Sequence, residues 1–189
     1  MLNKLILASK SPQRKKILQD MGISFKVVPS HIEETAEGLK KPHAIAKRIA
    51  LRKAEAIAKK HPDQWVLGCD TFVICSNKTL STKPKDREDA RQTIELYRNS
   101  YCDVYSGLAL INKKLNKKFV QFDKTRLKFK NFSDEDIEQY LCSGEWKGRS
   151  GSMTIEGRGG KWVKKIKGDY WNVVGLPVEL LKKFLNQIG

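Results

Sequence analysis

Short apolar segments of strand-like character alternate with helical segments along the chain, and this alternation restricts the fold more than any other feature. The first helix shows how clear the signals are: Ser11 is a favourable N-cap, Pro12 suits the first helical position, and Gly22 follows the last turn. Interleaved strands and helices predict the α/β class. We expect strands at 5–8, 25–28, 65–75, 101–111, 118–129 and 162–166, and helices at 12–21, 42–60, 85–98, after Ser133 and at 178–188.

The length and composition of the chain fit a single domain over residues 1–189. Hydrophobic residues make up 40% and charged residues 31% of the chain. No stretch approaches the ~18 apolar residues that cross a membrane, and the first residues run into charge too soon for a signal-peptide core. The four cysteines, none in a C-x-x-C pair, are expected to be reduced and mostly buried. We therefore expect a cytoplasmic protein without a membrane partner.

The formal net charge is +16, which raises the concentration of anions near the surface. Such an excess fits nucleic acid, an acidic membrane surface or a phosphorylated small substrate, and charge alone does not choose among them. Lysine pairs such as Lys113–Lys114 and Lys164–Lys165 are typical of solvated surface. The informative basic residues are those that a solvated surface does not explain.

A basic cluster surrounds the start of the first helix. Free N–H groups at a helix start and the helix dipole favour an anion there, and the hydroxyls of Ser9 and Ser11 add hydrogen-bond donors. Lys10, Arg14 and Lys15 add positive charge, although cations at this end oppose the dipole. The alternatives are a phosphate-binding loop and a solvated basic helix with a serine cap.

Lys53 occupies an unusual position on the second helix. On a helical wheel that starts at Ile45, it falls at about 80°, in the middle of the apolar arc formed by isoleucine and alanine side chains. A lysine on an inward face either extends its ammonium to solvent or faces a buried anion. Both interpretations remain open from the pattern.

Asp70 interrupts the apolar run at 65–75. An ionised carboxylate inside a buried strand is costly unless it is paired or bound to a metal. Alternation places Asp70 on the same side as Gly68 and Phe72, and Gly68 is expected to leave room for a ligand. The alternative is that the strand ends at Cys69 and Asp70 starts a turn. Because apolar residues resume at Phe72, we favour a functional site.

Other charged residues could complete a site for phosphoryl transfer: Glu33 and Glu34 in a loop, Lys83 before a proline, and Glu156 in a glycine-rich segment. Each alone is a common surface feature. In phosphoryl transfer, cations neutralise the phosphates, and carboxylates hold a divalent metal and orient water. Asp70, Glu33 and Glu34 are therefore the candidate ligands for Mg²⁺ or Mn²⁺.

Several motifs in a fixed order resemble the Maf-like nucleotide pyrophosphatases, also called septum formation proteins. The resemblance implies a mixed twisted sheet with flanking helices, two lobes around a deep cleft as in inosine triphosphatases, and often a homodimer. It also implies hydrolysis of a nucleoside triphosphate to the monophosphate and pyrophosphate with a divalent cation. The matching segments are Leu5-Ile-Leu-Ala-Ser-x-Ser-Pro-x-Arg, Ile32-Glu-Glu, Arg52-Lys-Ala, Gly68-x-Asp-Thr, Lys83-Pro, Tyr105-Ser-Gly, the stretch around Glu156 and Gly168-Asp-Tyr-x-Asn-Val-Val-Gly-Leu-Pro.

The resemblance also implies roles for individual residues. Asp70 matches the catalytic carboxylate, which accepts a proton from the attacking water, and Glu33 or Glu34 matches an acidic loop. The residues that match phosphate contacts are Ser9, Arg14, Lys53 and Lys83.

The positions that select the base divide between two subfamilies. The subfamily acting on dTTP and UTP has Arg, Thr and Gln at positions 13, 71 and 156, whereas the subfamily acting on 7-methyl-GTP has Trp, Gln and Glu. This chain has Gln13, Thr71 and Glu156. Thr71 matches the first subfamily, Glu156 the second and Gln13 neither, so a modified nucleotide stays among the expected substrates.

The sequence therefore predicts a metal-dependent nucleoside triphosphate pyrophosphatase. Two alternatives remain: a basic protein that binds nucleic acid, and a nucleotide-binding regulator of cell division with little catalysis. Nucleic acid is not the expected partner, because aromatic residues interleave with basic residues only at 128–130 and 162–167.

Overall fold

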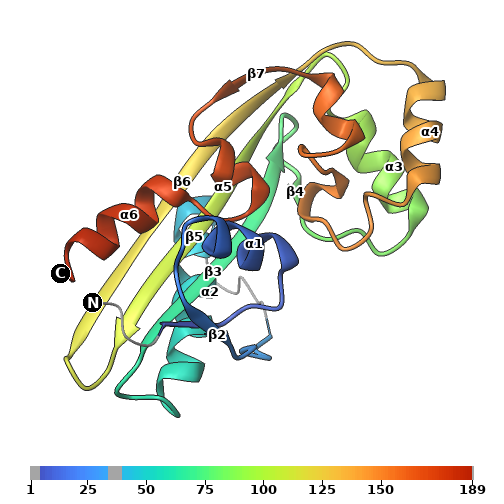
Figure 1. Ribbon diagram of the computed structural model, residues 1–189. Helices are drawn as coiled ribbons and strands as arrows, with labels where there is room; N and C mark the ends of the chain where they lie inside the picture. The colour runs from blue at the N-terminus through green and yellow to red at the C-terminus, as the bar shows by residue number, and fades with distance from the viewer. Residues whose placement is uncertain (1–4, 34–39, 189) are drawn as a thin grey trace. The chain divides into compact units, whose positions relative to one another are not determined.

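The computed structural model describes residues 5–33 and 40–188, and the predicted α/β class is confirmed. The described strands form one mixed sheet in the order β2-β1-β3-β5-β6-β7, with β4 paired to β3 (Figure 1). In chain order the elements are β1 (Leu5–Leu7), α1 (Pro12–Asp20), β2 (Phe25–Val27), α2 (Pro42–Ala58), β3 (Trp65–Cys75), β4 (Leu80–Ser81), α3 (Arg87–Glu95), β5 (Tyr101–Asn112), β6 (Lys117–Phe129), α4 (Asp134–Ser143), the 3₁₀ turns η1 (Ser150–Ser152) and η2 (Arg158–Trp162), β7 (Val163–Lys167), α5 (Tyr170–Val174) and α6 (Val178–Asn186).

The chain divides into two compact units. The first contains the residues up to Thr71, Ser106–Asp123 and the residues from Gly175 onward. The second contains Phe72–Tyr105 and Lys124–Val174. The long strands β3, β5 and β6 each contribute one end to either unit. The expected deep cleft between two lobes stays a prediction.

In the first unit, β1 lies between β2 and β3 and is parallel to both. The chain passes from β1 through α1 to β2 on one side, and then through α2 to β3 on the other. In open α/β sheets, ligands bind beyond the carboxyl end of a strand at such a reversal. The loop at 9–11 leaves β1 at this point, where Ser11 caps α1 and Pro12 opens it as predicted.

Two glycines allow α2 to pack closely against the sheet. A Cβ on Gly107 would lie 1.9 Å from the carbonyl oxygen of Ala46, and one on Gly68 would lie 2.2 Å from that of Ala50. The backbone of α2 therefore approaches β3 and β5 more closely than any side chain permits. The core beneath the helix is formed by Ile6, Ala50, Ala54, Ile57, Val66, Ala109 and Ile111.

In the second unit, α3 and α4 lie side by side (Figure 1). A capping box begins α4, the helix predicted after Ser133: the Ser133 hydroxyl accepts from the backbone N–H of Asp136, whose carboxylate accepts from that of Ser133. Stacked rings of Tyr97 and Phe129 lie in the core. Within the described part of the chain, no helix combines the length and the apolar character needed to cross a membrane.

Candidate active site

A buried ion pair joins α2 to β3 in the first unit. The ammonium of Lys53 lies 2.6 Å from Oδ1 of Asp70, and each side chain is 8% exposed. The helical wheel is thus confirmed in placing Lys53 inward, and Asp70 is the buried anion that it faces. Asp70 lies within β3, so the alternative of a turn after Cys69 is wrong.

The expected room for a ligand beside Gly68 is absent. Gly68 and Asp70 share one face of β3, and the space next to Gly68 is filled by the backbone of α2. The glycine serves the close approach of the helix, which in turn brings Lys53 within hydrogen-bond distance of Asp70. The expectation that Gly68 provides ligand space is wrong. A close helix and a bound ligand both require a residue without a side chain, so the sequence alone does not distinguish them.

Arg14 anchors a second cluster, formed by the loop after β1 and by β3. Although it is 8% exposed, its guanidinium donates from Nε to the Gly175 carbonyl at 2.8 Å and from Nη1 to Ser9 Oγ at 3.0 Å. Its Nη2 donates to Thr71 Oγ1 at 3.1 Å. The Ser9 hydroxyl also accepts from the backbone N–H of Ser11 at 3.2 Å, so the loop is held in one conformation. The neighbouring cations are less buried than Arg14: Lys10 is exposed and Lys15 is half-buried.

The Gly175 carbonyl is a functional group that the sequence did not single out. Besides Arg14, it accepts from Thr71 Oγ1 at 3.3 Å and from Cys69 Sγ at 3.4 Å. The backbone φ of Gly175 is +126°, a value that residues with a side chain rarely adopt. Glycine is therefore required where this carbonyl turns toward β3. Ser106, also not singled out, pairs its hydroxyl with Thr71 Oγ1 at 2.8 Å. The only sequence signal was that both lie in segments shared with the family.

The two clusters lie on opposite faces of β3, because Asp70 and Thr71 are consecutive residues of a strand. Cys69 lies on the face of Thr71, where burial raises the pKa of its thiol and the charges of Arg14, Asp70 and Lys53 also act on it. β1 pairs with β3 only as far as Leu67, so the loop at 9–11 takes the place of a neighbouring strand. Both clusters are therefore at the carboxyl end of β1.

The remaining candidate residues do not join these clusters in the described contacts. Glu33 is exposed, and Glu34 lies outside the described residues. Gln13 is half-buried in the first turn of α1. Lys83 and Glu156 are exposed residues of the second unit, Lys83 between β4 and α3 and Glu156 in a turn between η1 and η2.

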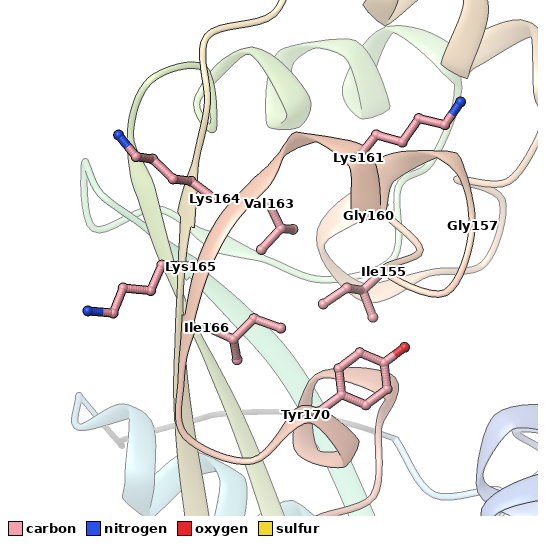
Figure 2. Close-up of a pocket in the computed structure, with 9 residues that line it drawn as sticks. All are labelled: Ile155, Gly157, Gly160, Lys161, Val163, Lys164, Lys165, Ile166 and Tyr170. Atoms are coloured by element: carbon pink, nitrogen blue, oxygen red, sulfur yellow. The ribbon is translucent and has the colours of Figure 1, made fainter.

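Glu156 lies close to a pocket of about 590 Å³ in the second unit. Its neighbours Ile155 and Gly157 line this pocket together with Tyr170, whose ring lies below Ile155 in Figure 2. Burial raises the pKa of the Tyr170 phenol, and the negative charge of Glu156 adds to the increase. Glu156 itself is exposed, and the pocket beside it has both apolar and lysine residues in its lining.

The Lys53–Asp70 cluster offers a divalent metal one carboxylate ligand, that of Asp70. Among residues 5–33 and 40–188, no group of three or more His, Cys, Asp or Glu side chains is placed to hold a metal ion. Mg²⁺ is commonly bound by one or two carboxylates together with substrate phosphates and water. Asp70 fits that kind of site, in which a triphosphate completes the coordination.

The strand, the loop with its hydroxyls and the helix start form an arrangement that, in α/β proteins, can bind a phosphate chain. The comparison with known sequences narrows this class of α/β proteins. The chain belongs to the family described as Maf-like protein, whose profile matches residues 4–188 and so spans both units.

Named relatives are similar over nearly their whole length. A dTTP/UTP pyrophosphatase of Dictyoglomus thermophilum is 36% identical over 100% of this chain and 98% of its own. One of Bacillus cytotoxicus is 38% identical over 98% of this chain and 96% of its own.

Solved structures share the fold at low sequence identity. The Ham1 protein of Staphylococcus aureus has a TM-score of 0.57 at 11% identity, covering 99% of this chain and 100% of that one. A HAM1 protein from Coxiella burnetii has a TM-score of 0.52 at 14% identity, covering 99% and 100%. These matches agree with the mixed sheet and flanking helices predicted from the sequence.

Proposed function

We propose that this chain is a nucleoside triphosphate pyrophosphatase that cleaves between the α- and β-phosphates and releases the monophosphate and pyrophosphate. The buried Lys53–Asp70 pair carries this proposal, because the next residue of β3, Thr71, is held by Arg14 of the loop and helix start. The pair supplies a carboxylate one residue along the strand from Thr71, which accepts a hydrogen bond from Arg14. Membership of the Maf-like family and the names of the full-length relatives support the same activity.

Each residue of the site has a distinct task in this reaction. Asp70 accepts a proton from the attacking water, and Lys53 fixes the orientation of its carboxylate. Arg14 uses three of its five N–H donors within the protein, which leaves two for a phosphate oxygen. Ser9, Ser11 and the start of α1 receive the rest of the phosphate chain. Lys83 of the second unit stays a candidate phosphate ligand on the sequence motif alone.

We infer that the reaction needs Mg²⁺ or Mn²⁺ that binds together with the triphosphate. Asp70 would be its protein ligand, with Glu33 or Glu34 as a second donor. When bound, the cation would neutralise charge on the phosphates during their displacement.

We assign the base preference to dTTP and UTP. Thr71 is the residue expected for this preference, and relatives that are 36% and 38% identical are named dTTP/UTP pyrophosphatases. Thr71 is also fixed by Arg14 and Ser106 in the first unit. Glu156 supports 7-methyl-GTP as a second candidate.

A panel of nucleoside triphosphates tests activity and preference together. With purified protein and Mg²⁺ or Mn²⁺, we expect pyrophosphate release from dTTP and UTP at least tenfold faster than from ATP, CTP or GTP. Adding EDTA should abolish the release. Faster turnover of 7-methyl-GTP would reassign the preference to Glu156, and absence of turnover with every nucleotide would contradict the proposal. Nucleotide binding without turnover would favour a regulator of cell division.

Replacing Arg14 with lysine should separate its charge from its geometry. Lysine keeps the positive charge but cannot bond Gly175, Ser9 and Thr71 at once. We expect kcat/KM for dTTP to fall about 100-fold, while Lys16→Arg, an exposed change on the same helix, leaves it unchanged. Parent activity in Arg14→Lys would argue that only the positive charge matters at this position.

The cellular setting and assembly are part of the same proposal. We place the protein in the cytoplasm, where the four free cysteines of the chain would stay reduced. We also propose a homodimer, which light scattering of the purified protein would detect.

A further inference from the structure

One face of β6 in the second unit is lined with cations. Lys124, Arg126 and Lys128 alternate with the buried residues Thr125 and Leu127, so the three basic side chains project from the same face. The side chain of Lys124 is 38% exposed and that of Arg126 is 46% exposed. The other face of the strand is part of the core.

The edge strand β7 adds a second row of cations next to that of β6. Lys165 lies directly opposite Lys128, and Lys167 lies opposite Arg126, so each pair shares one face of the sheet. The register shifts next to Lys128, which adds Lys164 as an extra residue of β7. Figure 2 shows the side chains of Lys164 and Lys165 on one side of β7 and those of Val163 and Ile166 on the other, although all four residues line the pocket.

A single acidic side chain on β5 balances only part of this charge. Asp103 accepts two hydrogen bonds from Arg126, at 2.6 and 2.7 Å, and forms an ion pair with Lys124 at 2.9 Å. Burial tends to raise the pKa of the Asp103 carboxyl, but Arg126 and Lys124 outweigh it and lower the pKa. The basic face, defined as Lys124, Arg126, Lys128, Lys164, Lys165, Lys167 and Asp103, carries six positive charges and one negative charge, a net +5.

Like charges directly opposite each other on a sheet destabilise it. The pair Lys128–Lys165 is therefore unfavourable to the fold, whereas Asp103 offsets the charge of Arg126 opposite Lys167. An anionic ligand would remove the remaining penalty. The site proposed for the triphosphate does not account for these cations, because its clusters are built from residues of the first unit.

We propose that the basic face is a binding surface for single-stranded nucleic acid, in addition to the proposed enzymatic site. Alternate residues along β6 are about 6.8 Å apart, and β7 runs about 4.8 Å away, so the cations form a narrow double row that an extended phosphate backbone can follow. Tyr101 lies at this face, 39% exposed, with the Arg126 guanidinium 4.3 Å from its ring centroid. Such a combination of cationic track and aromatic side chain is typical of single-strand binding.

Other polyanions fit less well. A membrane surface would call for apolar side chains to insert beside the cations, and Tyr101 is the large exposed hydrophobic residue found with them on the described face. A duplex would gain nothing from Tyr101, since its bases are stacked on each other. The chemistry on this face therefore favours unpaired bases.

The test compares two variants of equal charge. Lys128→Gln/Lys165→Gln/Lys167→Gln changes the basic face. Lys113→Gln/Lys114→Gln/Lys117→Gln removes the same charge from exposed residues of the turn between β5 and β6 and from the first residue of β6. Binding is measured by fluorescence anisotropy with labelled deoxythymidine and uridine oligomers of about 20 nucleotides that lack terminal phosphates. We expect at least tenfold weaker binding for the first variant at about 100 mM salt, and a log–log salt slope smaller by about 2. The control variant should bind within twofold of the parent protein.

Further measurements separate this proposal from the enzymatic one. Both variants should release pyrophosphate from dTTP at the parent rate, and excess dTTP should not displace the oligomer. Tyr101→Ala should weaken binding about tenfold, whereas Tyr101→Phe should preserve it. Undetectable binding by the parent, an equal loss in both triple variants, displacement by dTTP, or duplex binding as tight as that of the single strand would each overturn the proposal, whatever the outcome of the pyrophosphatase assay.

Discussion

Replacing Asp70 with asparagine is expected to lower kcat for pyrophosphate release by about 10³-fold, because an amide cannot accept the proton of the attacking water. The substitution preserves shape, and the amide oxygen can still accept a hydrogen bond from Lys53, which lies 2.6 Å from the carboxylate in the parent protein. The protein should therefore remain folded. KM for dTTP should change by less than tenfold, since the cluster of Arg14 lies on the other face of β3.

The measurement is single-turnover and steady-state pyrophosphate release, with thermal unfolding as a check on the fold. Asp86→Asn provides the matched control: it makes the same chemical change at the N-cap of α3, where asparagine caps as well as aspartate. The control should keep parent activity. A kcat for Asp70→Asn within tenfold of the parent would remove Asp70 from the proton-accepting role.

The pair that this variant tests could be located in part from the sequence. The spacing of apolar residues around Lys53 predicted that its side chain faces inward, because a helix repeats every ~3.6 residues regardless of what it packs against. The partner could not be identified, since snorkelling and ion pairing differ only in how closely the helix approaches the sheet. That distance is set by Gly68 and Gly107, which act together only after β3 and β5 are neighbours.

Backbone groups and short elements were less accessible to sequence reasoning. The Gly175 carbonyl accepts from three side chains, yet every residue has a carbonyl and no pattern distinguishes this one. β4 has only two residues and exists through its pairing with β3. α5 has five residues and begins where the Asp169 carboxylate accepts from the backbone N–H of Trp171. The Gly175 carbonyl and β4 depend on contacts with other segments, whereas the start of α5 has a local cap that holds only a short helix.

The glycines beneath α2 predict the largest change in stability. Replacing Gly107 with alanine would place a methyl carbon 1.9 Å from the carbonyl oxygen of Ala46 and 2.3 Å from its carbonyl carbon. Both atoms belong to the backbone of a helix that is packed on the sheet along Ala46, Ala50 and Ala54, so no side chain can turn aside to make room. We expect the free energy of unfolding to fall by more than about 4 kcal/mol, as for the most damaging core substitutions.

Urea unfolding followed by circular dichroism measures this loss, and Gly22→Ala is its control. Gly22 ends α1 with a φ of +68° and has no atom within 4 Å of an added Cβ, so alanine there adds backbone strain of about 1–2 kcal/mol without a clash. Gly68→Ala, whose Cβ would lie 2.2 Å from the Ala50 carbonyl oxygen, should resemble Gly107→Ala. If Gly107→Ala costs no more than Gly22→Ala, α2 can retreat freely, and close packing of this helix is not what fixes Lys53 against Asp70.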